Sequence, residues 1–153
     1  VSITQFHAGS ADNIIPQTAQ MRGTARTLSP EIRDLVENRL KEIVEGTARL
    51  YGATAKCTYL RDYPVTVNHP RQTDFAAAVA GDVAGAGRVD TKVAPVMGAE
   101  DFSFMLEARP GAYIFCGNGA SANLHHPAYD FNDAAIPFGA SYWIRLVERA
   151  MPA

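Results

Sequence analysis

Hydrophobic and polar residues alternate along the first part of the chain in the manner of short strands. Residues 1–7 alternate and are rich in β-branched side chains, which predicts a strand. Glycine, aspartate, asparagine and proline then predict a loop over 8–17. Residues 18–27 are expected to form a second strand antiparallel to the first, and residues 53–60 a third strand.

The apolar positions take on a helical period between the second and third of these strands. Ser29 can accept hydrogen bonds from the free first-turn amides, and Pro30 suits the first helical position. Gly52 can end the helix in a left-handed conformation, so the pattern predicts a helix from Pro30 to Tyr51. We expect its apolar stripe to pack on the sheet, which makes this part of the chain an α+β layer. The stripe comprises Ile32, Leu35, Val36, Leu40, Ile43, Val44 and Ala48.

The pattern differs in the second half, where helices alternate with a buried strand. An alanine-rich stretch predicts a helix over 72–83, and a short helix or helical turn is expected over 99–106. Residues 112–116 are almost continuously apolar, which is typical of a strand buried on both faces. Asn132 and Asp133 can cap a last helix, and this order of elements favours an α/β layer. The core face of that helix is expected to hold Ile136, Ala140, Trp143, Ile144 and Val147.

A domain boundary is expected between these two halves. Two X-Pro steps between residues 63 and 70 favour extended backbone, as in a connector. We therefore place one part at residues 1–67 and the other at residues 68–153. The chain opens on Val1, directly in a strand-like pattern, which suggests a fragment of a longer chain.

Composition argues against several classes of protein. The 14 lysines and arginines are balanced by 16 aspartates and glutamates, so the formal net charge of −2 argues against a nucleic-acid partner. No apolar run approaches the roughly 18 residues of a membrane span, so no membrane association is expected. Cys57 and Cys116 have no neighbouring cysteine or histidine, and we expect two separate buried thiols in a reducing cytoplasm.

Two acidic residues and two histidines are candidates for chemistry. Glu100 and Asp101 are adjacent and could bind a metal or act as acid and base, but a helix N-terminus explains them as well. His125 and His126 lie in a loop between the predicted buried strand and the last helix, where α/β folds place sites. The pair is either a metal ligand or a surface histidine pair. A catalytic zinc needs about three protein ligands, so further ligands would have to come from elsewhere.

Another polar cluster lies around the first two predicted strands. The amide of Asn13 could donate to a carbonyl oxygen, and Arg22 or Arg26 could clamp a carboxylate with two parallel hydrogen bonds. The structural alternatives are an Asx turn at Asn13 and solvated strand positions for the two arginines. The sequence fits both interpretations.

Four segments together resemble one family, the dinuclear metal-dependent amidohydrolases that include aminoacylases, hippurate hydrolase and the plant hydrolases of auxin–amino-acid conjugates. The segments occur in the order of the family and span nearly the whole chain. Each is weak alone, but four in order are a strong match. They are His7-Ala8-Gly9 to Asn13-Ile14-Ile15-Pro16, Arg22-Gly23-Thr24-Ala25-Arg26-Thr27, Met97-Gly98-Ala99-Glu100-Asp101-Phe102-Ser103, and Leu124-His125-His126-Pro127 to Tyr129-Asp130-Phe131-Asn132-Asp133.

The resemblance implies a subunit of two domains. Residues 1–67 would be an incomplete ferredoxin-like lid domain, beginning at the lid's second strand, that makes a homodimer. Residues 68–153 would be the C-terminal part of an α/β zinc-peptidase-like catalytic domain, with the crossing near Asn68. The family binds two divalent metal ions in each active site (zinc, manganese, nickel or cobalt). Most of its ligands lie in a Cys-x-His motif and further motifs that this chain does not contain.

The resemblance also implies roles for a few residues. His125, in the Leu-His-x-Pro segment, matches the one metal-ligand position present, whereas His126 occupies a position that varies. Asn13 resembles a lid asparagine that contacts the substrate, Arg26 a lid arginine near the substrate carboxylate, and His7 a lid residue that faces the active site. No catalytic residue is expected in this chain, because the general base of the family lies outside the matched segments.

The implied activity is hydrolysis of the amide bond of N-acyl amino acids by a metal-activated water. With a single candidate ligand, the chain is expected to be inactive on its own. The alternative is a non-catalytic module for dimerisation and substrate recognition. A coding sequence that extends upstream through a Cys-x-His motif would favour the enzyme, and one that begins at Val1 would favour the module.

Overall fold

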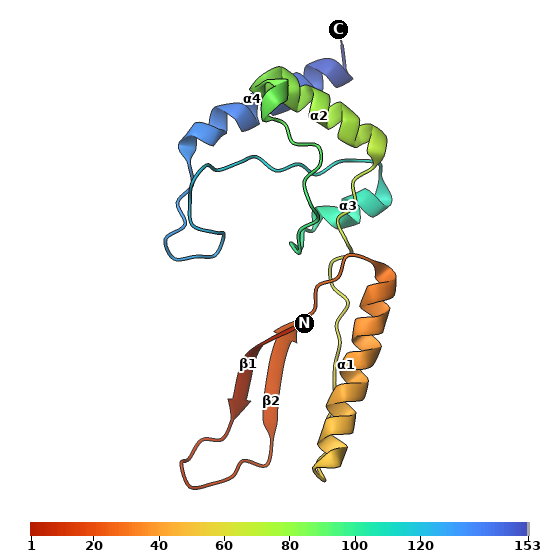
Figure 1. The fold of residues 1–153 in the computed structure, drawn as a ribbon, viewed down its shortest axis with the longest axis vertical. Helices are drawn as coiled ribbons and strands as arrows, with labels where there is room; N and C mark the ends of the chain where they lie inside the picture. The colour runs from red at the N-terminus through yellow and green to blue at the C-terminus, as the bar shows by residue number, and fades with distance from the viewer. Residues whose placement is uncertain (153) are drawn as a thin grey trace. The chain divides into compact units, whose positions relative to one another are not determined.

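The structure, a computed structural model, describes residues 1–152 and combines helices with one small sheet (Figure 1). This mixture agrees with the α+β class predicted from the sequence. In chain order the elements are β1 (Ser2–Ala8), β2 (Ala19–Thr24), α1 (Pro30–Leu50), α2 (Pro70–Ala84), η1 (Ala86–Arg88), α3 (Phe102–Ala108), η2 (Asp133–Ala135) and α4 (Ile136–Ala150), where η denotes a 3₁₀ turn.

The contacts within the chain divide it into two compact units. Unit 1 comprises Val1–Val65 and Pro95–Ala99, and unit 2 comprises Thr66–Ala94 and the chain from Glu100 onward. The boundary expected near Asn68 lies close to the first division, whereas the sequence pattern does not anticipate that Pro95–Ala99 belongs to unit 1. The assignment of the two parts to a lid and a catalytic domain stays a prediction.

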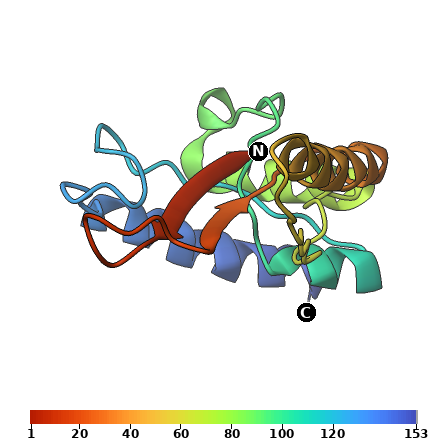
Figure 2. The same ribbon diagram turned by 90° about the horizontal axis from the view of Figure 1, so that it is seen from below.

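Unit 1 contains a β-hairpin. The strands β1 and β2 pair antiparallel, with Ser2 opposite Thr24 at one end and Ala8 opposite Ala19 at the other, as predicted (Figure 2). The register shifts once within β1, and Gly23 lies beside this irregularity. A Cβ atom at Gly23 would collide with the carbonyl oxygen of Ser2, so the close approach of the two strands requires glycine there.

The helix α1 begins at the residue that the sequence indicates and ends at Leu50, one residue before the predicted end. The Ser29 hydroxyl accepts a hydrogen bond from the Ile32 amide at 3.2 Å, and Pro30 occupies the first turn. Gly52 follows the helix with a φ of 71°, in the left-handed region that glycine adopts without strain. The predicted helix is therefore confirmed.

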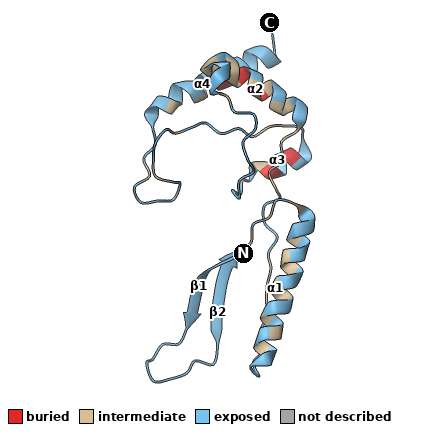
Figure 3. Ribbon diagram, viewed as in Figure 1, coloured by how far each residue is buried: buried red, intermediate tan, exposed pale blue. Residues whose placement is uncertain are grey.

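The packing of α1 differs from the prediction. Within the described residues the helix does not pack on either strand of the hairpin. Ile32, Leu35 and Ile43 of its apolar stripe remain about half exposed, and the strands are exposed along their length (Figure 3). Two short strands offer too narrow a surface to cover a helix of 21 residues, so the expected helix-on-sheet layer is not formed.

The segment after α1 runs beside the helix without becoming a strand. Arg61 pairs with Asp34 at 2.6 Å and with Glu37 at 2.7 Å, and Lys41 reaches the same Glu37 carboxylate at 2.5 Å. The hydrogen bonds from Lys41 and Arg61 lower the pKa of Glu37. The strand predicted over 53–60 is wrong for this structure, because a strand requires a partner and the described residues provide none.

Helices α2 and α4 pack against each other in unit 2. Val79 of α2 and Tyr142 of α4 are buried, and burial raises the pKa of the Tyr142 hydroxyl. Asp82 of α2 accepts hydrogen bonds from Arg145 and Arg149 of α4, both at 3.1 Å. Apolar burial and paired charges therefore join the two helices.

The helices predicted in the second half are present, some with shifted boundaries. The helix expected over 72–83 begins earlier, as α2, and Gly85 ends it with a φ of 87°. The short helix expected over 99–106 lies slightly later, as α3. The Asn132 side chain accepts a hydrogen bond from the Ala134 amide at 3.0 Å and so caps the 3₁₀ turn that leads into α4.

Residues 112–116 do not form the predicted strand buried on both faces. The Asn68 side chain accepts a hydrogen bond from the Tyr113 amide and donates one to the Tyr113 carbonyl oxygen, each at 2.8 Å. These two bonds resemble a single rung of a β ladder, but no strand pairs with the segment among the described residues. Ile114 and Phe115 remain exposed in consequence.

The described elements bury few side chains. The chain exposes 12409 Å² of surface, whereas a folded monomer of its 16.5 kDa exposes roughly 7,500 Å². Cys116 is exposed and Cys57 is half-buried, so the expected pair of buried thiols is not found. No helix among the described residues is long and apolar enough to cross a membrane.

We expect the 153-residue chain, expressed alone, to unfold without a sharp thermal transition, because folding removes so little apolar surface from water. The dye ANS, which binds exposed apolar surface, should fluoresce strongly with it. Calorimetry and an ANS titration measure both properties. A cooperative calorimetric peak from a monomer that does not bind ANS would contradict this expectation.

Candidate metal and substrate site

His125 combines an uncommon backbone conformation with free ring nitrogens. Its φ of 67° is the only positive value outside glycine among the described residues. Histidine enters the left-handed region more readily than most residues, but such a conformation still costs on the order of 1–3 kcal/mol. Within residues 1–152 its exposed ring makes no hydrogen bond or ion pair. The ring is therefore available to a ligand.

His126 differs because its ring is bound to its own loop. Its Nδ1 accepts a hydrogen bond from the Ala128 amide at 3.1 Å. Its backbone amide donates to the Asn123 carbonyl oxygen at 3.1 Å, and its carbonyl oxygen accepts from the Tyr129 amide at 2.9 Å. The assignment of the metal ligand to His125 rather than His126 stays a prediction, and this contrast is consistent with it.

Two side chains close the base of the loop that carries both histidines. The Asn118 side chain donates to the Asp130 carbonyl oxygen and accepts from the Asn132 amide, both at 2.8 Å. The Ser121 hydroxyl lies 3.1 Å from the same Asp130 carbonyl oxygen. The sequence patterns predict a role for neither residue. The available signal is the position of Asn118 between two glycines, where a side-chain amide can bond to a distant backbone segment.

Glu100 and Asp101 lie at the start of the short helix α3. The amide and the hydroxyl of Ser103 donate to the Glu100 carbonyl oxygen at 3.2 and 2.6 Å. Burial, followed by the charge of Glu100 and a hydrogen bond with it, raises the pKa of Tyr113. No group of three or more metal-binding side chains occurs in the part of the chain that the structure describes. Asp101 occupies the N-cap position of α3, but its side chain makes no capping hydrogen bond. Both interpretations of the acidic pair therefore stay predictions.

The candidate substrate residues of unit 1 lie at two ends of the hairpin. His7 is near the loop end of β1, and Asn13 lies in the loop that joins the strands, whereas Arg26 follows β2 at the opposite end. All three side chains are exposed. The 6 residues of β2 are separated by five steps of about 3.3 Å, so the strand alone separates the two ends by roughly 16 Å. One chain therefore does not bring Asn13 and Arg26 to the same end of its hairpin.

The described residues could supply some, but not all, of the ligands of a metal ion. An exposed imidazole without a competing hydrogen bond, as at His125, suits a divalent ion such as zinc. A catalytic zinc requires about three protein ligands, and no such group lies among the described residues. His125 therefore fits as one member of a larger set.

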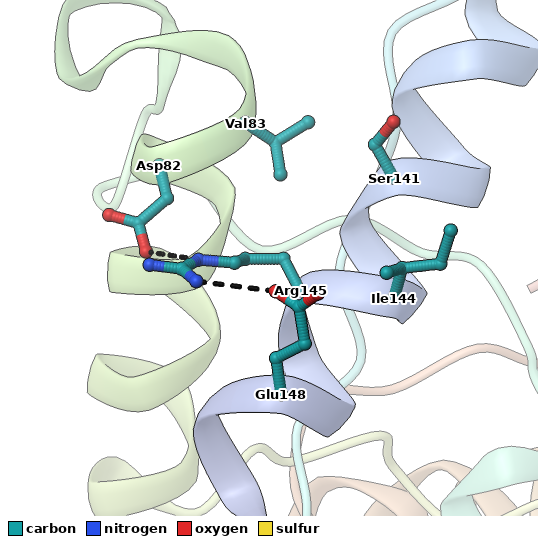
Figure 4. A pocket seen from close by; sticks show the side chains of 6 residues that line it. All are labelled: Asp82, Val83, Ser141, Ile144, Arg145 and Glu148. Atoms are coloured by element: carbon teal, nitrogen blue, oxygen red, sulfur yellow. Dashed lines mark hydrogen bonds and ion pairs between the residues drawn. The ribbon is translucent and has the colours of Figure 1, made fainter. Parts of the chain in front are cut away.

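A pocket between α2 and α4 involves none of these candidates. Its charged side chains pair within the protein, because Arg145 donates to Asp82 at 3.1 Å and to Glu148 at 3.3 Å. Both hydrogen bonds raise the pKa of Arg145. The pocket is explained by the packing of the two helices. It is lined by Asp82, Val83, Ser141, Ile144, Arg145 and Glu148 (Figure 4).

Comparisons with known proteins identify relatives of the chain. The profile of Peptidase family M20/M25/M40 matches residues 5–149. Hippurate hydrolase of Campylobacter jejuni is 36% identical over 146 residues, which are 95% of this chain and 38% of that protein. Thermostable carboxypeptidase 2 of Saccharolobus solfataricus is 41% identical over 118 residues, which are 76% of this chain and 29% of that protein.

A solved structure resembles this one. The YXEP protein of Bacillus subtilis, a dinuclear metal binding peptidase from the M20 family, has a TM-score of 0.74 and 28% sequence identity to this chain. The match covers 98% of this chain and 41% of that protein, and the chain spans 29% and 38% of the two curated relatives. The resemblance carried by the four sequence segments is confirmed, because a family profile matches nearly the whole chain. The chain belongs to Peptidase family M20/M25/M40.

Proposed function

We propose that this chain is part of a metal-dependent hydrolase that cleaves the amide bond of N-acyl amino acids. The observation that carries the proposal is His125, an exposed imidazole without hydrogen bonds in a backbone conformation that costs energy to hold. The similarity to a hippurate hydrolase supports this substrate class. The similarity to a dinuclear peptidase supports two divalent metal ions, for which we consider zinc, manganese, nickel and cobalt.

The residues of this chain would hold a metal ion and orient the substrate. When bound, the metal ions supply a Lewis acid and activate water for attack on the amide carbonyl. His125 would hold one ion, and Arg26 would clamp the substrate carboxylate with two parallel hydrogen bonds. Asn13, with His7 at the same end of the hairpin, would donate to a substrate carbonyl oxygen. We assign the general base and the other ligands to residues outside this chain.

We also propose the domain assignment that the resemblance implies. Residues 1–67 would belong to a ferredoxin-like lid, which is supported by the order of the elements in unit 1, two antiparallel strands followed by a helix. Residues 68–153 would belong to the C-terminal part of a catalytic domain. Free cysteines at 57 and 116 fit a reducing compartment, so we place the protein in the cytoplasm.

The second candidate function is a non-catalytic module for dimerisation and substrate recognition. The observation that favours it is the hairpin with two unpaired outer edges among the described residues, a surface that can pair with another chain without any metal. Such a module would bind N-acyl amino acids through Asn13 and Arg26 without hydrolysing them. The complete encoded protein, assayed with zinc, manganese, nickel or cobalt, distinguishes the two candidates by turnover.

Substitution of the two histidines tests the ligand assignment. In the complete encoded protein, His125→Ala is expected to lose bound metal and activity together, because it opens the coordination shell. His126→Ala should be milder, roughly 10–100-fold at most, because its ring can act only through a neighbouring ligand. Metal content and hydrolysis of N-acetyl and N-benzoyl amino acids measure both effects.

The isolated 153-residue chain is the control for this experiment and should not hydrolyse the same substrates above a metal-only blank. The assignment would be reversed if His126→Ala lost the metal while His125→Ala stayed near normal. Turnover by the isolated chain would show that its own residues complete the site.

Arg26→Lys tests the carboxylate contact. The substitution should raise KM for N-acyl amino acids more than for their carboxamide analogues, because an ammonium group cannot form the bidentate pair of a guanidinium. A charge-assisted hydrogen bond contributes roughly 1.5–3 kcal/mol, which corresponds to about a 10–150-fold rise in KM. Equal losses on both substrate types would leave Arg26 a structural residue.

We propose a homodimer through the hairpin, whose two outer edges are unpaired among the described residues. An unpaired edge is a template for another chain. If two hairpins pair antiparallel about a two-fold axis, the loop end of one lies beside the open end of the other. That arrangement would bring Asn13 of one chain near the partner's Arg26, which a single hairpin does not do.

Light scattering at micromolar concentration should therefore show a dimer of the complete encoded protein. Inactive Asn13→Ala and Arg26→Ala chains, reassembled in equal amounts, should recover about a quarter of wild-type activity, because half of the dimers are mixed and each mixed dimer has one intact site of two. Each variant reassembled with itself is the matched control. A monomer, or mixed dimers without activity, would contradict the arrangement.

A further inference from the structure

We propose that Asn118 is a positioning residue that sets the conformation of the metal-ligand loop. The proposal rests on the proposed function, because it takes His125 as a metal ligand. It adds a residue outside the four family segments, and one that would touch neither the metal nor the substrate. The loop in question comprises residues 119–131.

The hydrogen bonds of Asn118 connect its position to the far end of the loop. The side-chain nitrogen donates to the Asp130 carbonyl oxygen and the side-chain oxygen accepts from the Asn132 amide, both at 2.8 Å. A short side chain that satisfies one donor and one acceptor on alternate residues fixes both the separation and the orientation of the two backbone segments. Asn118 is itself half-buried, unlike the exposed Ser121 that bonds beside it.

The C-terminal end of the loop is also bonded, through Asn132, to the turn that precedes α4. Asn132 uses its own side chain to cap the turn before α4, by accepting from the Ala134 amide at 3.0 Å. Its carbonyl oxygen accepts from the Ala135 amide at 2.9 Å. Asn118 therefore attaches the start of the loop to a residue that is already fixed to the last helix.

His125 needs this attachment because its own side chain makes no hydrogen bond that would hold its backbone conformation. Its side chain has no hydrogen bond within the described residues, and its positive φ persists only where neighbouring structure enforces it. The bonds from the His126 amide to Asn123 and from the Tyr129 amide to His126 shape the turn locally. Asn118 is the side chain that joins the two ends of the loop around that turn, together with the longer contacts of Ser121.

The test is the zinc affinity of variants of the complete encoded protein, measured by competition with a chelator. Asn118→Ala is expected to bind zinc roughly 10–100-fold more weakly, the range found when groups that orient a metal ligand are removed. Asn123→Ala is the matched control, because it makes the same chemical change in the same loop and its side chain has no hydrogen bond within the described residues. It should bind zinc as the wild type does.

A second variant and a second signal separate positioning from a general loss of folding. Asn118→Leu keeps the approximate shape of the side chain without its hydrogen bonds, and should lose zinc affinity as the alanine variant does. The melting temperature of each metal-free variant is measured first. Zinc affinities are then compared between variants that have the melting temperature of the wild type. The visible absorption of bound Co²⁺ should change in both Asn118 variants, because it reports coordination geometry.

His125→Ala is measured in parallel, so that the two ideas fail separately. If His125→Ala retains wild-type zinc affinity, the assignment of His125 as a metal ligand in the proposed function is wrong. If His125→Ala loses zinc while folded Asn118→Ala and Asn118→Leu bind it like Asn123→Ala, the role of Asn118 is overturned and the ligand assignment stands.

Discussion

Two asparagine side chains bond together backbone segments of unit 2 that share no helix or sheet. Asn68 bonds both backbone groups of Tyr113, and Asn118 bonds the backbone of Asp130 and Asn132, all at 2.8 Å. An amide side chain offers one donor and one acceptor in the spacing of a β rung, so a single asparagine can bond to both backbone groups of another segment. These four bonds position the chain between α3 and α4, and the candidate metal ligand lies within that stretch.

The elements that the sequence predicts well are those whose signals are local. Ser29, Pro30 and Gly52 define the ends of α1 because a cap acts on amides or carbonyls within a turn of itself. The hairpin is predicted for the same reason, since its loop and both strands are adjacent in sequence. The strands expected over 53–60 and 112–116 fail because periodicity records which faces a strand would bury, whereas a strand exists only through a partner.

The candidate site likewise contains residues that the sequence predicts and residues that it does not. The residues around His125 form a contiguous segment, so the sequence identifies them through the family pattern, and the profile match supports that pattern. Asn118 escapes notice because its partners lie 12 and 14 residues away. The separation of Asn13 from Arg26 depends on the register of β1 and β2. The sequence alone does not show that these two residues lie at opposite ends of the hairpin.

The free energies of the backbone conformation and of the hydrogen bonds explain how one asparagine can hold the loop that carries His125. The left-handed conformation of His125 costs on the order of 1–3 kcal/mol, and each neutral hydrogen bond contributes about 0.5–1.5 kcal/mol net. The two bonds of Asn118 thus offset a cost of about the same size. Because the loop is exposed, apolar burial adds little to this balance. The conformation that presents the His125 ring therefore depends on hydrogen bonds formed by residues close to it in the chain, even where much of the apolar surface of the chain remains uncovered.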